Sequence, residues 1–105
     1  MKEITVKELA ELKEKGEDHQ LIDVREPHEY EFANIGGELI PLAQIPESEE
    51  LISRDKKVIM QCRSGARSAQ AVQYLENKLG LDNLYNLKGG ILAWSDEIDP
   101  SVPKY

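Results

Sequence analysis

The sequence predicts an α/β fold in which a largely parallel sheet is flanked by helices. Short apolar runs alternate with helix-like stretches along the chain, the pattern of strand–helix–strand units. The run KVIMQ at 57–61 has contiguous apolar residues, which indicates a strand buried on both faces, as in parallel sheets. No repeat, low-complexity block or linker interrupts the 105 residues, so we expect one domain spanning 1–105.

The first helix is predicted to begin at Thr5. Thr5 and Glu8 have the spacing of a capping box, in which each side chain bonds to the other residue's backbone N–H. Gly16 is a typical helix end. The inward-facing positions are Val6, Leu9 and Leu12.

The next part of the chain combines a strand, a short helix and an extended run. QLIDV at 20–24 is predicted to be a short buried strand. Pro27 suits the first position of a short helix that extends through Glu31. The glycine pair 36–37 separates this helix from residues 38–42, which we expect to be extended.

The second half repeats the alternation after the strand at 57–61. A helix is predicted over 68–79, a short strand over 83–87 and a last helix over about 91–98. The proline-containing tail is expected to lie extended on the surface. The inner stripe predicted for the helix at 68–79 is Ala69, Val72, Leu75 and Leu79.

Composition limits the partners and the compartment. Acidic residues outnumber basic ones by 20 to 13, for a net charge of −7, which argues against binding to nucleic acid or anionic membranes. No secretory pattern or membrane-length apolar stretch is visible, so we expect a cytoplasmic protein. The lone cysteine, Cys62, excludes an internal disulfide and a multi-cysteine zinc site, and it fits a reducing compartment.

Cys62 ends a predicted strand, and a short loop leads from it into a helix. Helix N-termini and tight loops present free N–H groups to an anion. Arg63 and Arg67 add positive charge nearby, and Gly65 permits a sharp backbone path. These effects favour the thiolate, so we expect a lowered pKa for Cys62. The small side chains of Ser64 and Ser68 leave room and can donate hydrogen bonds.

The same arrangement suits a persulfide, whose outer sulfur carries the negative charge. N–H donors would hold that sulfur as an oxyanion hole holds an oxygen. The alternative is a core cysteine at a strand end, a common position for this residue. The polar loop with its two arginines favours the functional interpretation, because neither arginine would serve a packing purpose there.

CRSGARS at 62–68 resembles the active loop of the rhodanese family. IDVREP at 22–27 and KGGI at 88–91, followed by Trp94, resemble the family's first motif and its closing glycine-rich turn. The resemblance covers nearly the whole chain and implies a rhodanese-like fold, with Cys62 as the catalytic residue. The loop residues that it implies bind the substrate are Arg63, Ser64, Gly65, Ala66, Arg67 and Ser68.

The resemblance also implies a function, a sulfurtransferase that takes sulfur from a donor such as thiosulfate and passes it to a thiol or protein acceptor. ANIGGE at 33–38 departs from the glycine-histidine stretch of many members. With the C-terminal sequence, it is similar to rhodanese domains fused to activating enzymes for ubiquitin-like sulfur carriers. Such a carrier or enzyme, or a cysteine desulfurase, is therefore an expected partner.

Asp23 and Arg25 are expected to support the scaffold rather than the chemistry. Arg25 leaves a buried strand and should pair with a carboxylate or with loop carbonyls. His19 and His28 have no cysteine partner nearby in sequence, so they are expected at the surface, and no metal or cofactor is predicted. Trp94 is expected in the core.

Two other functions compete with sulfur transfer. A phosphatase or arsenate reductase of related fold also places a cysteine before an arginine, but its loop has five intervening residues. Four separate Cys62 from Arg67 here, a shorter loop that favours a single sulfur atom. A noncatalytic binding or sulfur-relay module is the other alternative, and the intact cysteine argues against pure binding.

Overall fold

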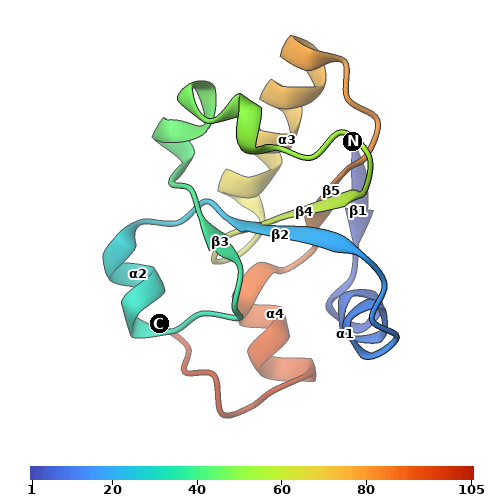
Figure 1. Cartoon of the computed structure of the whole chain (residues 1–105). Coiled ribbons are helices and arrows are strands. Elements are labelled where there is room, and N and C mark those ends of the chain that lie inside the picture. The colour runs from blue at the N-terminus through green and yellow to red at the C-terminus, as the bar shows by residue number, and fades with distance from the viewer.

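Five parallel strands form the centre of the computed structural model, which describes residues 1–105 (Figure 1). The order across the sheet is β1-β5-β4-β2-β3, so β4 is the central strand and carries the cysteine loop at its carboxyl end. The strands are β1 (Lys2–Ile4), β2 (His19–Asp23), β3 (Glu38–Leu39), β4 (Lys57–Gln61) and β5 (Leu84–Leu87).

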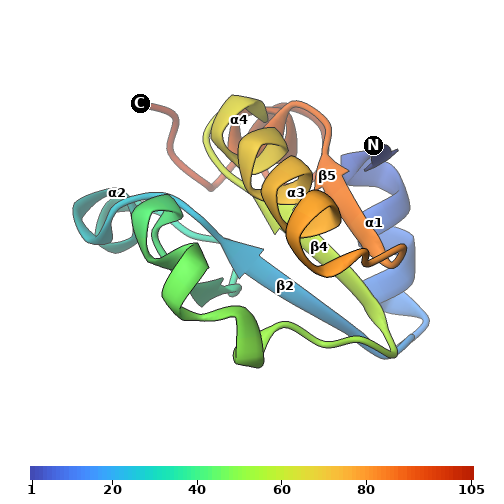
Figure 2. The ribbon, with the colours of Figure 1, turned by 90° about the horizontal axis from the view of Figure 1, so that it is seen from above.

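Helices cover both faces of the sheet. α1 (Val6–Glu14) and α4 (Gly90–Glu97) lie on one face, and α3 (Ala66–Leu79) lies on the other (Figures 1 and 2). The 3-10 helices η1 (Leu42–Glu47) and η2 (Glu49–Leu51) lie on the α3 side, where Ile45 joins the core. α2 (Pro27–Phe32) follows β2 at the carboxyl end of the sheet.

The alternation of side chains along β4 divides the core into two layers. Val58 and Met60 face α3, whereas Ile59 faces α1 and α4. Both layers are apolar and fully buried at this strand, which explains why its sequence is contiguously hydrophobic. Trp94 packs in the second layer, as predicted.

Most predicted elements are present at nearly the predicted positions. The strand at 57–61 has the predicted bounds. The predicted capping box begins α1: the Glu8 backbone N–H donates to the Thr5 hydroxyl at 3.1 Å, and the Thr5 backbone N–H donates to the Glu8 carboxylate at 2.9 Å. α3 begins at Ala66, two residues before the predicted start, because the loop after Cys62 turns directly into the helix.

Three details differ from the predictions. β1 was not predicted, since its three residues KEI carry too little apolar pattern to indicate a strand. The extended run at 38–42 contains a strand of only two residues before η1 begins. In α3, Ala71 is fully buried, whereas Ala69 and Leu79 are only partly buried, because the buried face follows the i, i+3, i+4, i+7 spacing from Ser68.

Candidate active site

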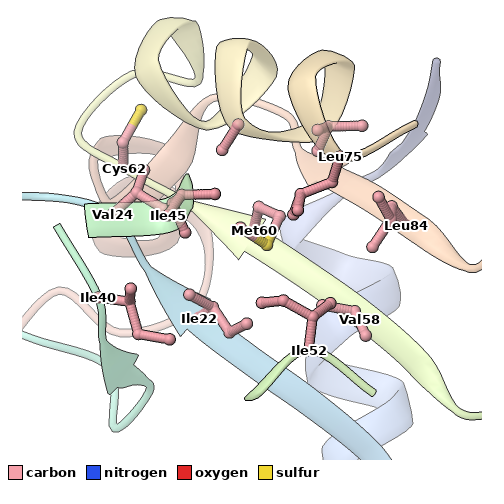
Figure 3. Close-up of a cluster of buried hydrophobic side chains, with 12 residues drawn as sticks. Ile22, Val24, Ile40, Ile45, Ile52, Val58, Met60, Cys62, Leu75 and Leu84 are labelled. Carbon is pink, nitrogen blue, oxygen red and sulfur yellow. The ribbon is translucent and has the colours of Figure 1, made fainter. Parts of the chain in front are cut away.

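Cys62 lies directly after β4 at the carboxyl edge of the sheet. It is 1% exposed and belongs to the apolar layer beneath α3. Figure 3 shows its sulfur pointing away from the cluster, toward the start of the α3 ribbon. The residue therefore has the burial of a core cysteine, but its sulfur faces the polar loop.

Hydrogen-bond donors of the loop surround the Cys62 sulfur. The backbone N–H groups of Gly65 and Ser68 donate to Sγ at 3.1 and 3.4 Å, and the Ser68 hydroxyl approaches it at 3.4 Å. Gly65 has a φ of +109°, a conformation that favours glycine, and this turn aims its N–H at the sulfur. The loop thus forms the predicted anion cradle.

The pKa of Cys62 is lowered from its usual value, as predicted. Burial by itself raises this pKa, but hydrogen bonds from the side chain and backbone of Ser68 and from the backbone of Gly65 and Ser64 outweigh it. Such donors stabilise the thiolate more than the thiol. The loop therefore increases the share of Cys62 that is thiolate at neutral pH.

The arginines act differently from the expectation. Arg67 forms a two-pronged salt bridge with Glu29 of α2, at 2.8 and 2.9 Å. This pairing lowers the pKa of Glu29 to about 2 and raises the pKa of Arg67. Arg67 is thus paired mainly with a carboxylate. The N–H and O–H groups of the loop are the main cause of the lowered pKa of Cys62.

Arg63 is held by Tyr105. Its guanidinium donates to the Tyr105 main-chain oxygen, and it lies 5.1 Å from the centre of the Tyr105 ring. The Tyr105 hydroxyl donates to Glu29 at 2.9 Å and accepts a bond from Arg25 at 2.8 Å. The prediction that the tail lies on the surface is therefore wrong at Tyr105, which packs between the arginines of the site.

Asp23 and Arg25 form a fully buried ion pair, with a closest distance of 2.7 Å. Arg25 also donates to the main-chain oxygen of Ala33 at 2.8 Å. Both kinds of partner that the sequence suggested, a carboxylate and a loop carbonyl, are thus present. The pair fixes the segment that follows β2, from which Glu29 reaches the loop.

The back of the loop rests on β5 and on the first turn of α4. The backbone N–H groups of Ile91 and Leu92 donate to the carbonyl oxygens of Cys62 and Arg63, at 3.0 and 3.2 Å. The Asn86 side chain donates to the Gly65 carbonyl at 3.1 Å and contacts the Ser68 hydroxyl. These bonds hold the carbonyl oxygens of Cys62, Arg63 and Gly65 in place.

Glu29, Asn86 and Tyr105 contact the loop residues but were not predicted from the sequence. Glu29 lies two residues after the first motif, and no role was predicted for it. Asn86 is an uncommon polar residue within a strand, a pattern that could have indicated a role. Nothing in the sequence indicated that Tyr105 would return to the loop. Two of the predicted loop residues, Ser64 and Ala66, are exposed to solvent.

Other features place no further chemistry at the site. His28 is exposed, and the His19 ring lies 2.8 Å from the Glu17 carbonyl oxygen. No three acidic, histidine or cysteine side chains gather as a metal-binding group. None of the helices has the length and apolar character needed to cross a bilayer.

Comparison with known proteins identifies the family. The model of the rhodanese-like domain matches residues 5–97. YqhL of Bacillus subtilis is 45% identical over 80 residues, which cover 75% of this chain and 63% of YqhL. A probable adenylyltransferase/sulfurtransferase, MoeZ of Mycobacterium tuberculosis, is 35% identical over 105 residues, covering 97% of this chain and 26% of MoeZ.

A solved structure shares both the fold and the extent of this chain. The rhodanese-like domain protein of Staphylococcus aureus superposes with a TM-score of 0.84 at 33% identity, covering 100% of this chain and 99% of that one. In contrast, this chain spans only about a quarter of MoeZ. The family match, the identities and the cysteine loop agree, and the chain belongs to the rhodanese-like domain family.

Proposed function

We propose that this chain is a sulfurtransferase that carries sulfur as a persulfide on Cys62. The observation that carries the proposal is the ring of donors from Gly65 and Ser68 around a buried sulfur with a lowered pKa. A ring of this kind stabilises one anionic sulfur atom without a metal or a general base. Related sulfurtransferase domains, such as that of MoeZ, support the same reaction class.

The reaction consists of two displacements at sulfur. The Cys62 thiolate attacks the outer sulfur of thiosulfate, a new S–S bond forms, and the bond within thiosulfate breaks with its electron pair leaving on sulfite. An acceptor thiolate then attacks the outer persulfide sulfur, and the Cys62 thiolate leaves. Negative charge is conserved in each step, so neither step needs an oxidant or reductant.

The loop favours sulfur transfer over phosphate chemistry. Four residues separate Cys62 from Arg67, and Arg67 is already paired with Glu29 on both of its terminal nitrogens. A phosphatase needs a free arginine to bind the oxygens of a phosphate, as guanidinium–phosphate recognition is two-pronged.

The physiological acceptor is proposed to be a protein. Adenylyltransferase/sulfurtransferases are among the relatives of this chain, which suggests a ubiquitin-like sulfur carrier with its activating enzyme as the partner. A cysteine desulfurase is the corresponding donor. A free thiolate at Cys62 requires reducing conditions, which are those of the cytoplasm.

Mass spectrometry of the intact protein tests the persulfide directly. After brief incubation with thiosulfate, wild type is expected to gain the mass of one sulfur atom and to lose it when a thiol is added. Cys62→Ala, with its fold verified by circular dichroism, is expected to gain nothing. A gain in Cys62→Ala, or no gain in wild type with thiosulfate and with a desulfurase, would contradict the proposal.

A further inference from the structure

Ser68 lies between two acceptors that compete for its hydroxyl. Its Oγ is 3.4 Å from the Cys62 sulfur and also contacts Oδ1 of Asn86. Cys62 is 1% exposed, Ser68 0% and Asn86 4%, so water has little access to these atoms. A serine hydroxyl carries a single proton and can donate it to one of these acceptors at a time.

The orientation of the Asn86 amide is fixed by its other contact. Its Nδ2 donates to the Gly65 carbonyl at 3.1 Å, and that carbonyl can only accept. Oδ1 must therefore face Ser68, as an acceptor. Asn86 thus holds the loop at Gly65 and, at the same time, offers an acceptor to the Ser68 hydroxyl.

We propose that Asn86 is a positioning residue that competes with the Cys62 sulfur for the Ser68 hydroxyl proton and thereby sets how readily this sulfur bears a negative charge. In the thiol form, the hydroxyl donates to Asn86. In the thiolate form, it turns to the sulfur, and Oδ1 of Asn86 loses its donor. Formation of the thiolate therefore carries the cost of a buried, unpaired acceptor.

This competition would favour the persulfide over the thiolate, and in this respect the inference rests on the proposed function. When the thiolate attacks the donor sulfur, the negative charge moves from Sγ to the outer sulfur, and no proton is gained or lost. Sγ then no longer needs the hydroxyl, which returns to Asn86. The restored hydrogen bond stabilises the loaded form relative to the thiolate.

A double-mutant cycle separates this coupling from a purely structural role. The pKa of Cys62 is measured from the pH dependence of its alkylation by iodoacetamide in the full chain. The four proteins are wild type, Ser68→Ala, Asn86→Ala and the double variant. The charged groups beside the loop are Arg63 and Arg67, with the partners Glu29 and Tyr105. They are the same in all four proteins, so their contribution cancels.

The cycle predicts a larger effect of Ser68→Ala when Asn86 is absent. When Asn86 is absent, the Ser68 hydroxyl donates only to the sulfur. Removing this hydroxyl should then raise the pKa of Cys62 by about one to two. With Asn86 present, the rise should be clearly smaller. Equal rises in the two backgrounds would overturn the inference, as would a larger rise in the presence of Asn86.

Ser95→Ala is the matched control, because Ser95 is also buried and its hydroxyl donates to a carbonyl, that of Val102. The pKa of Cys62 should not change in this variant. Circular dichroism and thermal unfolding check that each protein is folded.

A second measurement needs no substitution at Asn86. The ¹³Cγ resonance of Asn86 in wild type is expected to move as Cys62 titrates, because the carbonyl loses its donor. In Ser68→Ala, at least half of this movement should disappear. An Asn86 resonance that does not respond in wild type, or that responds equally in Ser68→Ala, would overturn the inference.

These readouts are independent of sulfur transfer. Coupling in the cycle without persulfide formation would refute the proposed function and leave the inference standing. Persulfide formation without coupling would do the reverse.

Discussion

At the scale of single residues, Glu29 connects the segment after β2 to the active loop. Its carboxylate accepts hydrogen bonds from both terminal nitrogens of Arg67 and from the Tyr105 hydroxyl. The Glu29 side chain is 10% exposed and that of Arg67 is 33% exposed, so the pair is only partly screened by water. Arg67 is thereby held at the start of α3 rather than free to bind a substrate anion.

Glu29→Gln is expected to weaken the fold in a pH-dependent way. The pKa of Glu29 is lowered to about 2, mainly by the Arg67 hydrogen bonds, from 4.5 in the unfolded chain. A lowered carboxyl pKa contributes stability that is complete above 4.5 and is lost as the pH falls toward about 2. At pH 7 the substitution should cost about 1–3 kcal/mol, with solvent screening at Arg67 favouring the lower end.

Urea unfolding at a series of pH values tests this prediction. Between pH 5 and 2, the stability of Glu29→Gln should fall less than that of wild type. Glu31→Gln is the control, because Glu31 is an exposed residue of the same helix. Parallel curves for wild type and Glu29→Gln would contradict the assignment.

At the scale of elements, the start of α4 is the support on which the cysteine loop rests. Gly90 has a φ of +59°, and a Cβ at this position would collide with the carbonyl oxygens of Cys62 and Arg63. These same oxygens accept hydrogen bonds from Ile91 and Leu92. Close contact between the two backbones is what lets one turn of helix fix the active loop.

Gly90→Ala is therefore expected to destabilise the protein by about 2–4 kcal/mol, from backbone strain and overpacking together. Sulfur loading of Cys62 should slow as well, because the loop must shift. Gly80→Ala is a matched control, since Gly80 has a φ of +65° and open space around it. It should cost only about 1–2 kcal/mol and leave loading unchanged.

Thermal unfolding and the rate of persulfide formation give the two readouts. Equal destabilisation by Gly90→Ala and Gly80→Ala would show that the collision does not matter.

At the scale of the whole molecule, the C-terminal tail and α2 meet at the site. The tail passes from α4 toward α2 (Figure 1), and Tyr105 lies among Arg25, Glu29 and Arg63. Phe32 of α2 packs edge-on against its ring at 5.8 Å. Tyr105 thus occupies donors of Arg63 that an anionic sulfur donor would otherwise reach.

Tyr105→Ala removes the hydroxyl bonded to Arg25 and Glu29 and the ring that lies against Arg63. Because these contacts hold the main-chain oxygen of residue 105 against Arg63, their loss is expected to release Arg63 and to lower the KM for thiosulfate roughly two- to fivefold, the effect of freeing one partly exposed charge. The kcat should change less, because the donors around the Cys62 sulfur are untouched. Lys104→Ala is the control, since Lys104 pairs with Asp96 away from the loop. A KM that stays the same or rises in Tyr105→Ala would show that the tail does not compete with the substrate.

Strong local patterns explain what could be predicted from the sequence. The contiguous apolar residues at 57–61 fix the central strand, and the Thr5–Glu8 capping box fixes the start of α1. The loop from Cys62 to Ser68 was predicted because strand end, glycine and helix start are adjacent in sequence. The donors around the Cys62 sulfur come from residues adjacent in sequence, so they could be predicted from the sequence.

Contacts between residues far apart in sequence decided the rest. Glu29 meets Arg67 across 38 positions, Asn86 meets Ser68 across 18, and Arg25 meets Tyr105 across 80. No local pattern encodes such pairs, because they arise from the order of strands in the sheet and from the path of the tail. The sequence alone determined the fold class and the loop that surrounds the Cys62 sulfur with hydrogen-bond donors. Only the tertiary structure decided that Arg67 pairs with Glu29 and Arg63 with Tyr105. Charged side chains pair with the partners that the packed fold brings within reach.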